Sequence, residues 1–185
     1  MKPNKDKILQ ALNYLASTQK NNTISEMKAY KLLWLADRYH LRQYGRTITH
    51  DNYYALPLGV VPSNAKIMIE SIPEKKEYQK FLQRSKKYYY TSIKSVNEKE
   101  FSKTDKDVLN LIIEKFGDMT PASLSKLSHQ FPEWKRFEEK LEMGKRKSYK
   151  VHIDDFFENC KEKSGLFVDD DEFLSLTKEL SFEMN

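Results

Sequence analysis

Four side chains in the first third of the chain could ligate a metal ion or act as an acid–base pair. Asp37 and His40 are three residues apart, which places both on one face of a helix, and His50 and Asp51 follow shortly after. The helical HExxH spacing of many metalloenzymes is absent. Hydrogen bonding within the fold explains these residues without a metal. We therefore expect no metal centre and no cofactor.

A second group joins hydroxyl side chains to a base, since Ser125 and Ser128 precede His129. No Gly-x-Ser-x-Gly elbow accompanies them. The loop from Leu58 to Ser63 also lacks the lysine of a phosphate-binding loop. We expect a protein that is not an enzyme, and a hydrolase using Asp37, His40 and His50 is the alternative.

Asp37 stands in a helical pattern that is otherwise largely apolar. A buried carboxylate requires partners, because losing them costs several kcal/mol. We expect Asp37 to accept hydrogen bonds from Arg46, Thr47 or backbone amides of the loop after the helix. The other interpretation places Asp37 on a recognition surface with Arg38 or His40.

The helix that carries Asp37 is predicted to run from an N-cap at Ser25 to Tyr44, with Gly45 as its left-handed stop. Apolar residues occupy most of its circumference, so we expect a central helix with neighbours on two sides. One stripe is predicted to be solvated: Lys28, Lys31, Arg38 and Arg42.

The remaining elements predict a mainly α fold, a compact helical domain with a small antiparallel β-hairpin. Helices are expected over about 4–19, after Ser63, after Thr104, after Thr120 and after Pro132. We expect a strand at Tyr53–Leu56 to pair with a second strand at Lys87–Ile93. Gly59 is expected to supply a positive φ or a close backbone approach, and Pro62 to start a helix.

Composition limits the class of protein. A chain of 185 residues with 39% hydrophobic content can form one compact domain. It contains no run of roughly 18–20 apolar residues, and its start lacks the apolar region of a signal peptide. We expect a cytoplasmic protein that makes no membrane contact, in which Cys160 is a reduced thiol.

The net charge is distributed unevenly along the chain. Residues 1–150 carry 29 basic against 17 acidic side chains, a net charge of +12, whereas residues 151–185 carry 3 against 10, a net −7. We expect a domain over 1–150, a basic linker at Met143–Lys150 and an acidic extension over 151–185 that packs on the domain or on a partner. The extension ends in a helix whose apolar groups need burial: Phe173, Leu174, Leu176, Leu180 and Phe182.

Two blocks of sequence carry a resemblance to a known family. The first lies within Leu35–Ser63 and contains Asp37-Arg38, His40-Leu41, Tyr44-Gly45-Arg46, Ile48-Thr49, Asp51, Tyr54-Ala55 and Gly59-Val60-Val61-Pro62-Ser63. The second is LSKLSHQFPEW, from Leu124 to Trp134. Together they resemble the Panacea domain, also called the SocA-like or GepA-type phage-associated domain. Val60 stands where that family often has a proline.

The resemblance implies an antitoxin of a bacterial, prophage-type toxin–antitoxin system, which binds a cognate protein toxin and covers it or delivers it to a protease such as a Clp-type complex. It also implies a structural role for the motif residues, which are Asp37, His40, Gly45, Arg46, Asp51, Gly59, Pro62, His129 and Trp134. Aromatic and arginine side chains dominate protein interfaces. We therefore expect toxin contacts from Lys28, Arg38, Arg42, Tyr53, Tyr54, Tyr88 and Tyr90.

A DNA-binding regulator of its own operon is the alternative function. The helices around Thr120–Leu141 have the look of a helix-turn-helix. The second of them opens with Pro132-Glu133 and contains further acids, which suits a phosphate backbone poorly. We therefore do not expect nucleic acid to be the partner.

Overall fold

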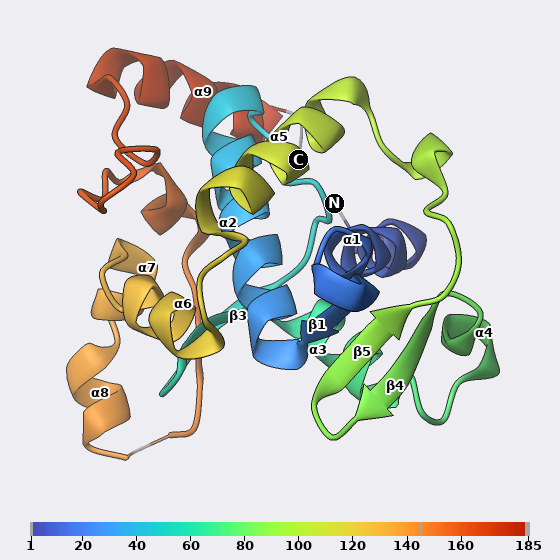
Figure 1. The fold of residues 1–185 in the computed structure, drawn as a ribbon. Helices are drawn as coiled ribbons and strands as arrows, with labels where there is room; N and C mark the ends of the chain where they lie inside the picture. Colours follow the sequence, from blue (N-terminus) through green and yellow to red (C-terminus); the bar gives the residue numbers. More distant parts are fainter. Residues whose placement is uncertain (1, 145, 184–185) are drawn as a thin grey trace.

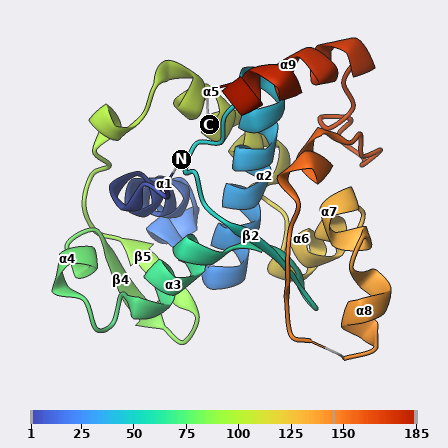
Figure 2. The ribbon, with the colours of Figure 1, turned by 180° about the vertical axis from the view of Figure 1, so that it is seen from behind.

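The computed structural model describes residues 2–144 and 146–183 and has the predicted architecture, a helix-dominated α+β fold (Figures 1 and 2). Its helices are α1 (Lys5–Ser17), α2 (Glu26–Tyr44), α3 (Ser63–Ser71), α4 (Lys76–Gln79), α5 (Lys103–Phe116), α6 (Pro121–Ser128), α7 (Pro132–Lys135), α8 (Glu138–Glu142) and α9 (Asp171–Glu183). Short 3₁₀ turns lie at η1 (Lys20–Asn22), η2 (Glu98–Glu100) and η3 (Ile153–Phe157). Within these residues no helix is long and apolar enough to cross a bilayer.

Helix α2 is the centre of the molecule, as predicted. The Ser25 hydroxyl accepts the amide of Lys28, and Gly45 ends the helix with φ 71° while its amide donates to Leu41 O at 2.9 Å. Helices α1, α5, α6 and α9 and strand β3 (Gly59–Pro62) all pack against it (Figure 1). An apolar circumference can be buried only when neighbours surround it, which accounts for this arrangement.

Two small antiparallel sheets replace the single sheet that we predicted. One has the order β1 (Thr23–Ser25), β5 (Tyr89–Ser92), β4 (Leu82–Lys86), and the other has the order β3, β2 (Tyr53–Leu56), β6 (Tyr149–Lys150). The predicted pairing of the strand at 53–56 with the strand at 87–93 is therefore wrong. The two strands that we expected to pair instead form hairpins with their neighbours in sequence, β2 with β3 and β5 with β4, because short hairpin loops cost little closure entropy. Strands β1 and β6 add to these hairpins from distant parts of the chain, β1 beside β5 and β6 beside β2.

The segment after α8 joins the body of the protein at several points. Strand β6 lies beside β2, with Tyr54 opposite Lys150, and η3 and α9 then pack on α2. The expected linker at Met143–Lys150 thus ends in a sheet, and its Lys145 lies outside the described residues. The division into 1–150 and 151–185 stays a prediction.

The carboxylate of Asp51, which precedes strand β2 in the sequence, caps the N-terminus of helix α3. Its Oδ1 accepts the amide of Asn64 at 2.8 Å and its Oδ2 the amide of Ala65 at 2.8 Å. We expected Ser63 to cap this helix, but Ser63 is its first residue and Pro62 precedes it without a capping hydrogen bond from its side chain. The carboxylate of Asp51 thereby fixes the loop after α2 to the start of α3.

Gly59 meets both expectations that we placed on it. Its φ is +99°, and a Cβ at this position would lie 1.7 Å from Ser128 Oγ and 2.6 Å from Lys31 Nζ. The backbone of β3 therefore approaches α2 and α6 more closely than any other residue type allows.

Gly59→Ala should strongly destabilise the fold, by about 3 kcal/mol or more, because it combines an unfavourable φ with overpacking. Gly144→Ala is the matched control. Gly144 also has a positive φ, +66°, but nothing in the described chain lies within 4 Å of where its Cβ would stand, so a loss of about 1 kcal/mol is expected. Urea denaturation measures both. Equal losses would contradict the close packing at Gly59.

Candidate functional site

Helix α2 carries a row of cationic side chains inside the protein. Lys31 is 1% exposed and Arg38 and Arg42 are both fully buried, so the prediction of a solvated stripe is wrong for these three residues. Of the four residues in the predicted stripe, only Lys28 is partly exposed to solvent. The reason is the central position of α2, whose polar positions also face other elements of the fold.

Arg38 makes an ion pair with Glu133 of α7 inside the core. Its Nε lies 3.0 Å from Glu133 Oε1, which also accepts the indole N–H of Trp34 at 3.1 Å. The Arg38 guanidinium lies over the ring of Phe131, 4.8 Å from its centroid, and donates to Glu158 O at 2.6 Å. Burial raises the pKa of Glu133, and the charge of Arg38 opposes that shift.

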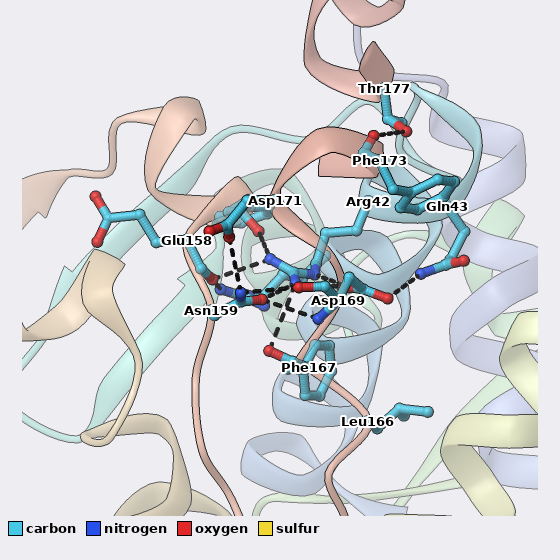
Figure 3. A network of polar contacts seen from close by, with 12 residues as sticks. Arg42, Gln43, Glu158, Asn159, Leu166, Phe167, Asp169, Asp171, Phe173 and Thr177 are labelled. Carbon is cyan, nitrogen blue, oxygen red and sulfur yellow. Dashed lines mark hydrogen bonds and ion pairs between the residues drawn. The ribbon is translucent and has the colours of Figure 1, made fainter. Parts of the chain in front are cut away.

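Arg42 holds the C-terminal segment through the network in Figure 3. Its Nε and Nη2 donate to Asp169 Oδ2 at 2.9 and 2.6 Å, and Nη2 also donates to Asn159 Oδ1 at 2.7 Å. Its Nη1 donates to the carbonyls of Phe156 and Glu158 at 3.0 and 2.9 Å. One guanidinium thus binds η3 and the segment that leads from it to α9, through two backbone carbonyls and two side chains.

Lys31 is buried beside the close contact at Gly59. Its Nζ donates to Val60 O at 2.8 Å, and burial lowers its pKa to about 7. Arg38, Arg42 and Lys31 therefore stabilise contacts within the fold, and none of them offers a charge to a partner.

Asp37 is fully buried and accepts two hydrogen bonds from one residue. Thr49 donates its backbone N–H to Oδ1 at 2.9 Å and its hydroxyl to Oδ2 at 2.5 Å. The predicted tie between α2 and the following loop is confirmed, although the donor is Thr49 and not Arg46 or Thr47. Burial raises the pKa of Asp37 to about 6, against the effect of the Thr49 hydrogen bonds.

Three cationic or imidazole groups, one each from α1, from α2 and from the loop after α2, converge on Asp105, a residue that we did not single out from the sequence. His40 Nε2, Arg46 Nη2 and Lys7 Nζ lie 3.1, 2.8 and 2.6 Å from its carboxylate oxygens. His40 Nδ1 lies 2.8 Å from Arg46 O. Although burial by itself raises the pKa of Asp105, hydrogen bonds from His40, Lys7 and the amide of Ser102 hold it well below its usual range. The arrangement joins α1, α2 and α5.

The second motif block is also structural. The ring of His129 stacks on that of Trp134, 3.8 Å between centroids at 13°. The Trp134 indole donates to Leu56 O at 2.8 Å, which connects α7 to strand β2. Burial, with the charge of Lys31, lowers the pKa of His129.

The seven residues expected to contact a toxin do not form one surface. Besides Arg38 and Arg42, Tyr53 and Tyr90 are buried, at 4% and 2% exposure, because they face the core from alternate positions of their strands. Tyr88 is 54% exposed at the β4–β5 turn, and Tyr54 and Lys28 are half-buried. These three remain accessible, and whether they contact a toxin stays a prediction.

The positions of the described side chains and helices bear on two alternatives, a metal site and a DNA-binding helix-turn-helix. In the part of the chain that the structure describes, no three His, Cys, Asp or Glu side chains are placed to hold a metal. Helix α7, which would be the recognition helix of a helix-turn-helix, is a single turn whose Glu133 is buried against Arg38. A single turn is shorter than the recognition helix that such proteins place in the major groove.

Together these observations define a helix-dominated α+β domain in which the motif residues hold the fold together. The model of the family described as antitoxin SocA-like, Panacea domain matches residues 30–135. This protein belongs to that family, as the two sequence blocks predicted. The chain matches no curated protein and no solved structure.

Asp169→Ala should loosen the C-terminal segment, since it leaves the buried Arg42 guanidinium with fewer partners. We expect a loss of about 2–4 kcal/mol in the free energy of unfolding and faster proteolysis within 160–183. Asp154→Ala is the matched control, because the pair of Asp154 with Lys178 is exposed and should contribute less than about 0.5 kcal/mol. Equal effects of the two substitutions would contradict the anchoring role of Arg42.

Asp37→Asn should change how stability depends on pH. The folded pKa of about 6 exceeds the unfolded value of 3.8, so the cost of the charged form develops as pH rises from about 4 to about 6 and remains above that range. Relative to the variant, wild type should lose on the order of 2 kcal/mol between pH 4 and pH 7. Urea denaturation over this range measures the difference. Parallel curves for the two proteins would contradict the assignment.

Proposed function

We propose that this protein is the antitoxin of a toxin–antitoxin pair and that it neutralises a protein toxin by binding it directly, without catalysis. Membership of the SocA-like Panacea family carries the proposal. Antitoxins of this kind act through surface complementarity, so the proposal needs a stable scaffold and an accessible surface and does not need an active site.

The arrangement of the titratable residues supports a role without catalysis. Asp37 accepts two hydrogen bonds from Thr49, Asp51 accepts backbone amides at the start of α3, and the two ring nitrogens of His40 lie beside Arg46 O and the Asp105 carboxylate. A general acid or base must reach the reacting atom of a substrate, and these groups are buried and occupied by the fold. Each is explained by the structural contact that it makes.

The test uses the product of the reading frame next to this gene. That product, expressed alone, should arrest growth, and coexpression of this protein should restore growth and allow the two to be copurified. A steady toxin level during rescue indicates occlusion, and a falling level that depends on a cellular protease indicates delivery. A neighbouring product without toxicity, or toxicity that this protein does not relieve, would refute the pairing.

His50→Ala addresses the hydrolase alternative without disturbing the core, because the ring of His50 is only half-buried. Rescue of growth should be unchanged in this variant and in Asp37→Asn. Loss of rescue in both, with the fold retained by circular dichroism, would favour a hydrolase.

A further inference from the structure

Helix α9 packs on the protein through its more polar row and exposes its apolar row. Its buried row is Leu174, Thr177 and Ser181, at 4–5% exposure. Its exposed row, which we call the α9 stripe, is Phe173, Leu176 and Leu180, at 39%, 58% and 47%. Spacings of three and four residues place the stripe on one helix face. A helix that contributed only to the stability of this domain would bury its leucines and phenylalanine first.

The stripe is held on a fixed helix. The Asp170 carboxylate accepts the amides of Glu172 and Phe173 at 3.0 and 3.2 Å, which begins α9. Immediately before it, Asp169 is bound to the buried guanidinium of Arg42 (Figure 3). Figure 1 shows α9 lying along the outside of the molecule, against the C-terminal part of α2. A surface ordered before binding loses less conformational entropy on association than a flexible tail does.

Acidic side chains border the stripe on one side. Glu172, Glu179 and Glu183 are all exposed, and each occupies the row next to Phe173, Leu176 and Leu180. If two copies docked through this face, the glutamates of the two helices would be brought together, and such like-charge contacts are unfavourable. A partner whose apolar groove is bordered by lysine or arginine would satisfy both the stripe and its acidic border.

We propose that the α9 stripe is the docking surface for a protein partner that presents an apolar groove with a basic rim. The inference rests on the proposed function, under which this partner is the toxin. Leu176 and Leu180 enter the groove, and Glu179 and Glu183 meet the rim. The residues expected from the sequence to contact the toxin, by contrast, lie elsewhere or are buried.

The experiment measures binding of the purified growth-arresting neighbour to the full-length chain by calorimetry or biolayer interferometry. Leu176→Ala/Leu180→Ala should weaken binding at least about 30-fold, because two anchors are removed. Leu58→Ala/Ile67→Ala removes apolar side chains that are at least as exposed, at 58% and 65%, from another part of the surface and should change affinity less than about threefold.

A second pair of variants tests the acidic side chains that border the α9 stripe. Glu179→Lys/Glu183→Lys should slow association about tenfold at low salt, with a smaller difference at high salt. Glu77→Lys/Glu142→Lys has the same net charge, with both changes at exposed positions outside α9, and should associate at close to the wild-type rate.

The outcomes separate the two proposals. If wild type neutralises the toxin and the α9 variants bind it as well as their controls do, the α9 inference is overturned and the proposed function stands. If wild type neither binds nor neutralises the neighbour, both fail. If light scattering shows a wild-type dimer that Leu176→Ala/Leu180→Ala converts to a monomer, the face serves self-association and the inference is likewise overturned.

Discussion

The burial of two guanidinium groups on the central helix is the constraint on which much of this structure depends. Arg38 and Arg42 have no exposed surface, and a charge removed from water must recover that cost from hydrogen bonds and opposite charge. Their partners come from α7, η3 and the segment before α9, between Glu133 and Asp169. Helix α2 therefore cannot be buried correctly until the C-terminal third of the chain is in place.

This requirement explains why the acidic segment after residue 150 packs on the basic part of the chain that precedes it. The family match ends at residue 135, yet the partners of Arg42 lie between Phe156 and Asp169. The carbonyls and carboxylate in that interval satisfy the guanidinium, and α9 follows directly. The ion pair of Arg42 with Asp169 thus fixes where α9 begins, and of the large apolar residues of α9 only Leu174 is buried, whereas Phe173, Leu176, Leu180 and Phe182 are exposed.

Two motif carboxylates, Asp37 and Asp51, and the carboxylate of Asp105 outside the motif also hold segments of the fold together. Each accepts hydrogen bonds from another segment of the chain and thereby fixes the loop after α2 or the end of a helix. Carboxylates at such positions have the appearance of a catalytic set when only the sequence is considered. Their geometry instead meets the hydrogen-bonding needs of backbone amides and buried cations.

The sequence by itself determined what depends on local chemistry: the extent of α2, its Ser25 cap and Gly45 stop, the positive φ at Gly59, the helix-dominated fold and the family. Caps, helical periodicity and a glycine's conformational freedom act over a few residues, so one sequence is enough to predict them. Tertiary structure alone decided which polar groups are buried and which strands pair. The Arg38–Arg42 row has the spacing of a solvated stripe, and only the packing of α6, α7, η3 and α9 around α2 makes it interior. Asp105 and Asp169 gain their importance from cations far away in the chain, and no local pattern encodes such contacts.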